Sequence, residues 1–97
     1  MAELSGKQKR HLRALGHHLE PALMIGAQGV AEGPIGELDR SLAVHELVKV
    51  RVGQGCPLER QEVAAALAAA TGSAVAQILG RTLLFYRAAG KPHIALP

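Results

Sequence analysis

Hydrophobic and polar residues alternate most regularly over residues 47–52. Val48, Val50 and Val52 alternate with Leu47, Lys49 and Arg51. A period of two is typical of a strand with one buried face. We therefore predict a strand here, whose second face is basic and open to water. A short apolar run at residues 22–25, followed by turn residues, predicts another, buried strand.

Three other stretches have helical spacing, at residues 6–19, 31–44 and 58–70. Each presents apolar side chains at intervals of three and four residues, which is typical of a helix with one buried side. Ser5 is a suitable N-cap for the first helix. The residues predicted to face the core are Leu12, Leu15 and Leu19 in the first helix, Ile35, Leu38 and Leu42 in the second, and Val63, Ala66, Leu67 and Ala70 in the third.

The last elements have the pattern of a β-hairpin. Residues 74–79 and 82–87 flank Gly80 and Arg81, and glycine at the first central position suits a type II′ turn. Ile94 and Leu96 are expected to add an extended piece. The predicted order is α-β-α-β-α-β-β, which indicates an α/β (α+β) fold with a four-stranded mixed sheet and helices packed on it. With 97 residues, we expect a single domain, 1–97.

A glycine loop joins the strand at 22–25 to the second helix. It consists of Gly26, Ala27, Gln28 and Gly29. Two glycines three apart let the backbone adopt positive φ and approach a bulky group closely, because neither carries a Cβ. A loop that leads into a helix start also directs N–H groups at an anion, for which we suggest an RNA phosphate. The same spacing fits a simple tight turn, so both interpretations remain open.

The basic residues are concentrated in the first helix. The formal net charge is only +3, yet four of the eleven Lys and Arg residues lie in residues 7–19, with no acidic residue among them. Lys7, Arg10, Arg13 and His17 recur at helical spacing opposite the leucines, and Lys9 and His11 flank them. A solvated helix face normally mixes charges of both signs, so this face is a candidate surface for a polyanion. A plain solvated surface is the alternative.

Other classes of function have little support. The lone Cys56 excludes an intrachain disulfide and a cysteine-based zinc site, and fits a reducing cytoplasm. We find no signal peptide or membrane span, and therefore expect a cytoplasmic protein with no membrane partner. No nucleotide-binding motif is present, and His17 and His18 diverge by about 100° on a helix. We expect no enzyme activity, catalytic residue, metal, cofactor or small-molecule substrate.

Five ordered blocks of the sequence resemble the YhbY-type CRM domain, the RNA-binding module of chloroplast splicing factors and bacterial ribosome-maturation proteins. The match covers nearly the whole chain. The blocks are residues 5–15 (SGKQKRHLRAL), 23–29 (LMIGAQG), 30–33 (VAEG), 45–51 (HELVKVR) and 78–87 (ILGRTLLFYR). The loop at 53–57 departs from the polar and charged loop that is usual in relatives, so we do not place RNA there.

The resemblance implies a fold similar to the C-terminal domain of translation initiation factor three. It also implies a partner, ribosomal RNA in precursors of the large ribosomal subunit, and a role in ribosome assembly. Nothing in the sequence indicates an obligate dimer, so we expect a monomer. The implied RNA-binding residues are Gly26, Ala27, Gln28 and Gly29 in the loop, Lys7, Lys9, Arg10 and Arg13 in the first helix, and also Lys49, Arg51, Arg81 and Arg87.

The shortage of aromatic residues limits the mode of RNA recognition. Phe85 and Tyr86 are the only aromatic residues of the Phe, Tyr and Trp class, and strand alternation turns one of them toward the core. We therefore expect recognition of RNA shape and backbone, with little base stacking. A KH domain is disfavoured, because its Gly-x-x-Gly loop joins two helices. A ribosome-associated protein–protein adaptor with a basic face is the alternative function.

Overall fold

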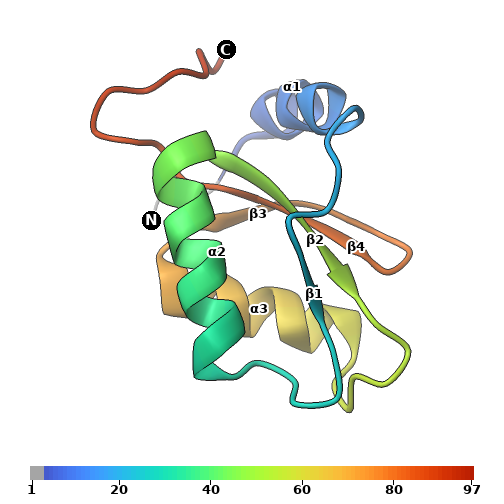
Figure 1. The fold of residues 1–97 in the computed structure, drawn as a ribbon. Helices are drawn as coiled ribbons and strands as arrows, with labels where there is room; N and C mark the ends of the chain where they lie inside the picture. The colour runs from blue at the N-terminus through green and yellow to red at the C-terminus, as the bar shows by residue number, and fades with distance from the viewer. Residues whose placement is uncertain (1–3) are drawn as a thin grey trace.

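The predicted order of elements is confirmed in a computed structural model that describes residues 4–97 (Figure 1). The elements are α1 (Gly6–Gly16), β1 (Leu23–Ile25), α2 (Glu32–His45), β2 (Leu47–Val52), α3 (Arg60–Thr71), β3 (Ala74–Leu79) and β4 (Thr82–Tyr86). The four strands form one sheet in the order β1-β2-β4-β3. β1 runs parallel to β2, whereas β4 is antiparallel to both of its neighbours. The predicted mixed sheet with packed helices is therefore confirmed.

The main core lies between the sheet and the layer formed by α2 and α3. The valines of β2 point into it, as their alternation predicts, together with Leu83 and Phe85 of β4. The helices contribute Leu38 and Leu42 from α2 and Val63, Ala64 and Leu67 from α3. Ile35 packs against this cluster and is partly buried. Within α3 the predicted inward face is partly wrong, because Ala66 and Ala70 are exposed and Ala64 is buried instead.

The hairpin and the end of α3 follow the local sequence signals. Gly80 has a φ of +57° and Arg81 has a negative φ, which is the combination that a type II′ turn requires. Gly72 ends α3 in the left-handed region with a φ of +65°.

α1 covers part of the second face of the sheet. Ser5 caps it as predicted, because its side chain accepts the Gln8 N–H at 3.0 Å while the Gln8 side chain accepts the Ser5 N–H at 3.0 Å. Leu12 is fully buried against a small cluster that contains Leu47, Ala76, Leu84 and Tyr86. The prediction that this sheet face is open to water is therefore only half right, because α1 buries Leu47.

α1 ends at Gly16, three residues before the predicted end, where the helix comes closest to the sheet. A Cβ at this position would lie 2.8 Å from Cδ2 of the buried Leu84. Only glycine lets the helix backbone approach the strand this closely. Two of the three leucines predicted to face the core, Leu15 and Leu19, are 42% and 38% exposed. The predicted apolar stripe is therefore wrong beyond Leu12.

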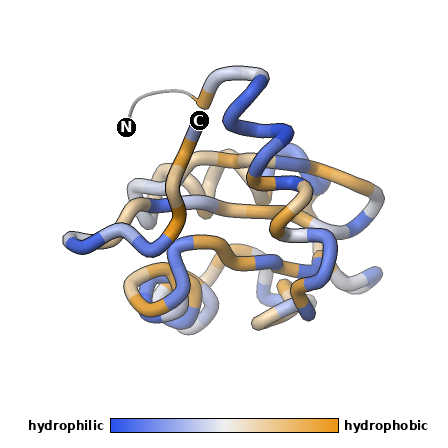
Figure 2. Tube along the Cα trace, turned by 90° about the horizontal axis from the view of Figure 1, so that it is seen from above, coloured by the Kyte–Doolittle hydropathy of each residue, from blue (hydrophilic) through white to orange (hydrophobic). Residues whose placement is uncertain are grey.

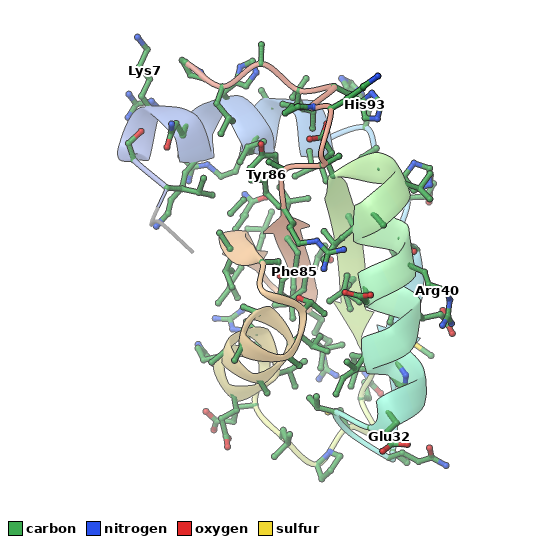
Figure 3. All side chains as sticks on the ribbon, turned by 90° about the vertical axis from the view of Figure 1, so that its left-hand side faces the viewer. Lys7, Glu32, Arg40, Phe85, Tyr86 and His93 are labelled. Atoms are coloured by element: carbon green, nitrogen blue, oxygen red, sulfur yellow. The ribbon has the colours of Figure 1, made fainter. Side chains whose placement is uncertain are left out.

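A buried carboxylate holds the C-terminal segment in place. Glu46, directly after α2, has a φ of +63° and is fully buried. Its carboxylate accepts the N–H groups of Ala89 at 2.8 Å, Ile94 at 3.0 Å, and His93 (labelled in Figure 3). Burial raises the pKa of Glu46, but these three donors and the attraction of His93 outweigh it, so the pKa lies below the usual glutamate value.

The segment that Glu46 holds forms no strand. The predicted extended piece instead packs Ile94 and Leu96 against the cluster under α1. The Gln8 side chain also donates to the Pro97 carbonyl at 3.3 Å. The C-terminal segment thus runs back beside the first turn of α1, as Figure 2 shows.

Replacement of Gly16 by alanine tests the close approach of α1. We expect Gly16→Ala to lower the free energy of unfolding by about 1–3 kcal/mol, because the new methyl group overpacks Leu84. The matched control is Gly33→Ala, in the first turn of α2, where nothing lies within 4 Å of the added Cβ. That variant should keep or gain stability by about 0.5–1 kcal/mol. Urea denaturation measures both, and equal effects would contradict the close approach.

The buried carboxylate predicts a pH-dependent C-terminal segment. Because the folded pKa of Glu46 is lowered, its contribution is complete above the ordinary glutamate pKa of about 4.3 and is lost as pH falls through the lower folded value. The protection of the Ala89, His93 and Ile94 amides against hydrogen exchange, measured by NMR relative to the intrinsic rate at each pH, should therefore fall in acid. In Glu46→Gln these amides should exchange faster at neutral pH, and their extra acid dependence should disappear. Unchanged protection in this variant would contradict the assignment.

Candidate nucleic-acid interface

The four predicted cations of α1 are all exposed. They are Lys7, Lys9, Arg10 and Arg13. α1 contains no acidic residue, and its tube is mostly hydrophilic in Figure 2. Within residues 4–97, the only ion pair joins Arg87 to Asp39 at 2.6 Å. The charges of α1 are thus uncompensated by salt bridges inside the described chain and face solvent.

The same side of the sheet carries further cations. Lys49 and Arg51 alternate with the inward-facing valines of β2, so they lie on the face that α1 partly covers. Arg51 is exposed and Lys49 is half-buried. Arg81 lies exposed at the tip of the hairpin, where its carbonyl accepts the Val52 N–H at 2.7 Å. The predicted cations of β2 therefore lie on one side of the molecule with those of α1, whereas Arg81 lines a cavity of about 600 Å³ with Glu59 and Arg60 at the start of α3.

Acidic residues occupy the opposite layer. α2 and α3, with the cap of α3, contain Glu32, Glu37, Asp39, Glu59 and Glu62, all of them exposed. On the α1 side, the exposed acid of the described chain is Glu20 in the connection to β1, since Glu46 is fully buried. The small net charge of +3 therefore hides an uneven distribution: cations dominate the α1 side, whereas the other side carries these five carboxylates together with Arg40, Arg60 and Arg87.

The two glycines of the loop have different roles. Gly29 is buried against Pro57 and Leu58, has a φ of +67°, and donates its N–H to the Gly26 carbonyl at 3.0 Å. It forms the tight turn. Gly26 is half-exposed with nothing within 4 Å of a Cβ, and the intervening Ala27 and Gln28 are exposed, so the backbone here is open to a ligand. The tight-turn interpretation therefore holds for Gly29, whereas the phosphate contact at Gly26 stays a prediction for which the structure leaves space.

The start of α2 is a weaker anion site than the sequence suggests. Its N-cap is Ala31, whose side chain makes no capping hydrogen bond, so the helix start is open. Glu32, however, is exposed in the first turn, where its carboxylate already interacts with the positive end of the helix dipole and repels a phosphate. The exposed backbone of residues 26–28 is therefore the better contact.

The loop and α1 lie at opposite ends of the molecule. Both Figure 1 and Figure 3 place α1 at the top and the start of α2, marked by Glu32 in Figure 3, at the bottom. The loop is instead beside the end of β2, since the Gly53 N–H donates to the Ile25 carbonyl at 2.8 Å. The structure does not bring the predicted residues into one compact site. α1 lies over the sheet face that carries Lys49 and Arg51, and the glycine loop lies at the far end of the sheet.

Arg87 lies apart from this set. Its guanidinium donates to Asp39 Oδ1 at 2.6 Å, to the Asp39 carbonyl at 2.9 Å and to the Thr71 carbonyl at 2.7 Å. These contacts tie β4 to α2 and α3, on the acidic side of the molecule. We therefore leave Arg87 out of the interface.

Neither aromatic residue is available to stack on a base. Phe85 is fully buried in the main core, and Tyr86 is buried under α1 on the other face, as Figure 3 shows. Burial raises the pKa of Tyr86, and the Glu46 carboxylate adds to this. The sequence predicts that one ring faces the core, and in the structure both rings are buried.

Within the described residues, no three His, Cys, Asp or Glu side chains gather in a way that could hold a metal ion. None of the helices in residues 4–97 has the length and apolar character that crossing a bilayer demands.

Known proteins similar to this chain match it over most or all of its length. A Haemophilus influenzae protein named "RNA-binding protein" is 38% identical over 97 residues, which are 100% of this chain and 98% of that protein. The Bacillus subtilis "Probable RNA-binding protein YqeI" is 39% identical over 84 residues, 87% of this chain and 88% of its own. The solution structure of SAV1595 from Staphylococcus aureus matches with a TM-score of 0.83 and 39% identity, covering 97% of this chain and 99% of that one.

Residues 4–87 match the family model of the CRS1/YhbY (CRM) domain, in agreement with the five blocks found in the sequence. With this match and the full-length relatives, the chain belongs to the CRS1/YhbY (CRM) domain family.

Proposed function

We propose that this chain is a non-enzymatic RNA-binding protein that contacts RNA with the α1 side of its sheet. The observation that carries the proposal is the separation of charge across the sheet, which leaves one side suited to a polyanion and the other repelling it. The names of the relatives support RNA as the polyanion. The family resemblance further suggests ribosomal RNA in precursors of the large subunit, bound in the cytoplasm during ribosome assembly.

Two kinds of contact would contribute to RNA binding. The cations of α1, with Lys49, Arg51 and Arg81, would supply the salt-dependent attraction to phosphates, which carries no sequence information. The open backbone of Gly26, Ala27 and Gln28 would approach a phosphodiester closely and donate N–H groups to it. Because the loop and α1 lie at opposite ends, the RNA would run along the sheet between them.

Charge reversal on α1 tests the basic surface. We expect Lys9→Glu/Arg10→Glu to weaken binding to a single-stranded RNA by more than tenfold, because two phosphate contacts are replaced by repulsion. With about four contacts, the wild-type log affinity should fall with log salt at a slope near −3, and the variant's slope should be shallower by about 1.4. Fluorescence anisotropy at several salt concentrations measures both quantities.

The control for this experiment changes the same charge on the acidic side. Arg10→Glu and Arg40→Glu each replace an exposed helix arginine, on α1 and on α2 respectively. Only the first should weaken binding; equal effects would show a response to net charge alone.

Crosslinking in cells, with sequencing of the attached RNA, identifies the RNA that the double variant loses. Protein partners that survive nuclease treatment would favour the adaptor instead.

The loop predicts a steric effect at Gly26. Gly26→Val should leave the free energy of unfolding nearly unchanged, because the site is open, yet weaken RNA binding about tenfold by keeping a phosphate away from the backbone N–H groups. Gly55→Val is the matched control, since Gly55 is an equally open loop glycine in a segment that we do not assign to RNA. Fluorescence anisotropy measures the RNA affinity of both variants. An equal loss of affinity in both would contradict a role of the loop in the interface.

A further inference from the structure

The half of the sheet that α1 leaves uncovered has the features of a platform for bases. We propose that it binds the unstacked bases of single-stranded RNA on the side chains of Met24, Arg51 and Leu79, which we call the open platform. The inference rests on the proposed function and specifies the class of RNA and the manner of contact.

Strand register places these side chains in one row. Met24 of β1 pairs with Arg51 of β2, Arg51 with Thr82 of β4, and Thr82 with Leu79 of β3. Paired residues point to the same face, so the row crosses the whole sheet on the α1 side. Three inter-strand steps give it a width of roughly 14 Å. A four-stranded sheet of this width holds two or three bases in an RRM.

The row is exposed although much of it is apolar. Met24 is 60% exposed and Leu79 is 65% exposed, and Arg51 between them is exposed as well. α1 rests on the other half of this face, where Leu47, Leu84 and Tyr86 are buried. A Cβ on Gly53 would lie 3.3 Å from the Met24 sulfur, so Gly53 leaves room for the thioether beside the loop that follows β2.

The chemistry of the row favours bases over an apolar protein surface. Arg51 stands within it, Lys49 precedes Arg51 on the same face of β2, and the row itself contains no acidic residue. A guanidinium plane stacks on bases, and methionine sulfur makes favourable contacts with flat aromatic rings. Because both rings are buried, these non-aromatic side chains would contact the bases, in place of the backbone recognition that the shortage of aromatic residues predicts. A duplex keeps its bases stacked inside and would leave Met24 and Leu79 without contacts.

The open platform also joins the two separated parts of the interface. Leu79 lines a cavity of about 540 Å³ together with Lys9 and Arg13 of α1. At the other end of the row, Met24 is two residues before the open backbone of Gly26. A single RNA strand can therefore pass from α1 over the open platform to the glycine loop, with its phosphates near cations and its bases on the row.

Binding to strands with and without bases tests the proposal. The probes are a labelled twelve-nucleotide RNA, the same strand made abasic, and its duplex, all measured by anisotropy on the full chain. Wild-type protein should bind the normal strand about tenfold more tightly than the abasic strand. Met24→Ala/Leu79→Ala should weaken binding of the normal strand about five- to tenfold and leave the abasic strand and the salt slope unchanged. Val44→Ala, at an exposed apolar residue of α2, is the control and should change nothing.

A charge-preserving variant separates stacking from attraction. Arg51→Lys keeps the positive charge and loses the guanidinium plane, so it should reduce the preference for the normal strand without changing the salt slope. Equal binding of normal and abasic strands by the wild type, or tighter binding of the duplex, would overturn the open platform and leave the proposed function standing. No salt-dependent binding of any of the three probes would overturn both.

Discussion

The placement of α1 on the sheet determines both the stability of the second face and what remains free for function. The helix rests on β4 through Gly16, whose missing side chain lets the backbone approach Leu84, and it buries Leu12 at the same time. Because α1 ends at this contact, it covers only the half of the sheet around Leu47 and Tyr86. A helix that continued in register to residue 19, with three leucines inward, would have covered more of this face. Arg51 and the apolar residues beside it are exposed because the helix ends where it does.

Much of the fold follows from local patterns. The alternation in β2, the glycine of the hairpin and the Ser5 cap each depend on residues within a few positions of one another, so the sequence alone identifies them. The errors have non-local causes. The leucines at the end of α1 are exposed where Gly16 meets Leu84, a residue about 70 positions later in the chain. α3 is so rich in alanine that its pattern hardly favours Ala66 over Ala64 as the inward residue. Packing against β3 and the core determines that Ala64 is the buried one.

The candidate site shows the same division. Helical spacing and strand alternation correctly group the cations of α1 with Lys49 and Arg51 on one side, because both are local geometric rules. They cannot reveal that Arg87 binds Asp39, or that Glu46 accepts amides from a segment more than 40 residues away. The sequence pattern does not distinguish Met24 from its neighbours, because a methionine within an apolar run resembles a core residue. Its register opposite Arg51 is the signal that separates it from Leu23 and Ile25, and this requires the strand pairing.

The separation of acidic and basic side chains across the sheet makes the molecule an electric dipole whose axis crosses its layers. In the field of a polyanion, a protein with such a dipole rotates before contact, so that most encounters begin with its α1 side facing the polyanion. The carboxylates of α2 and α3 outnumber the arginines on the same side, so they disfavour the approach of a polyanion from that direction. Orientation in solution, and not only attraction at contact, is built into the distribution of charge along the chain.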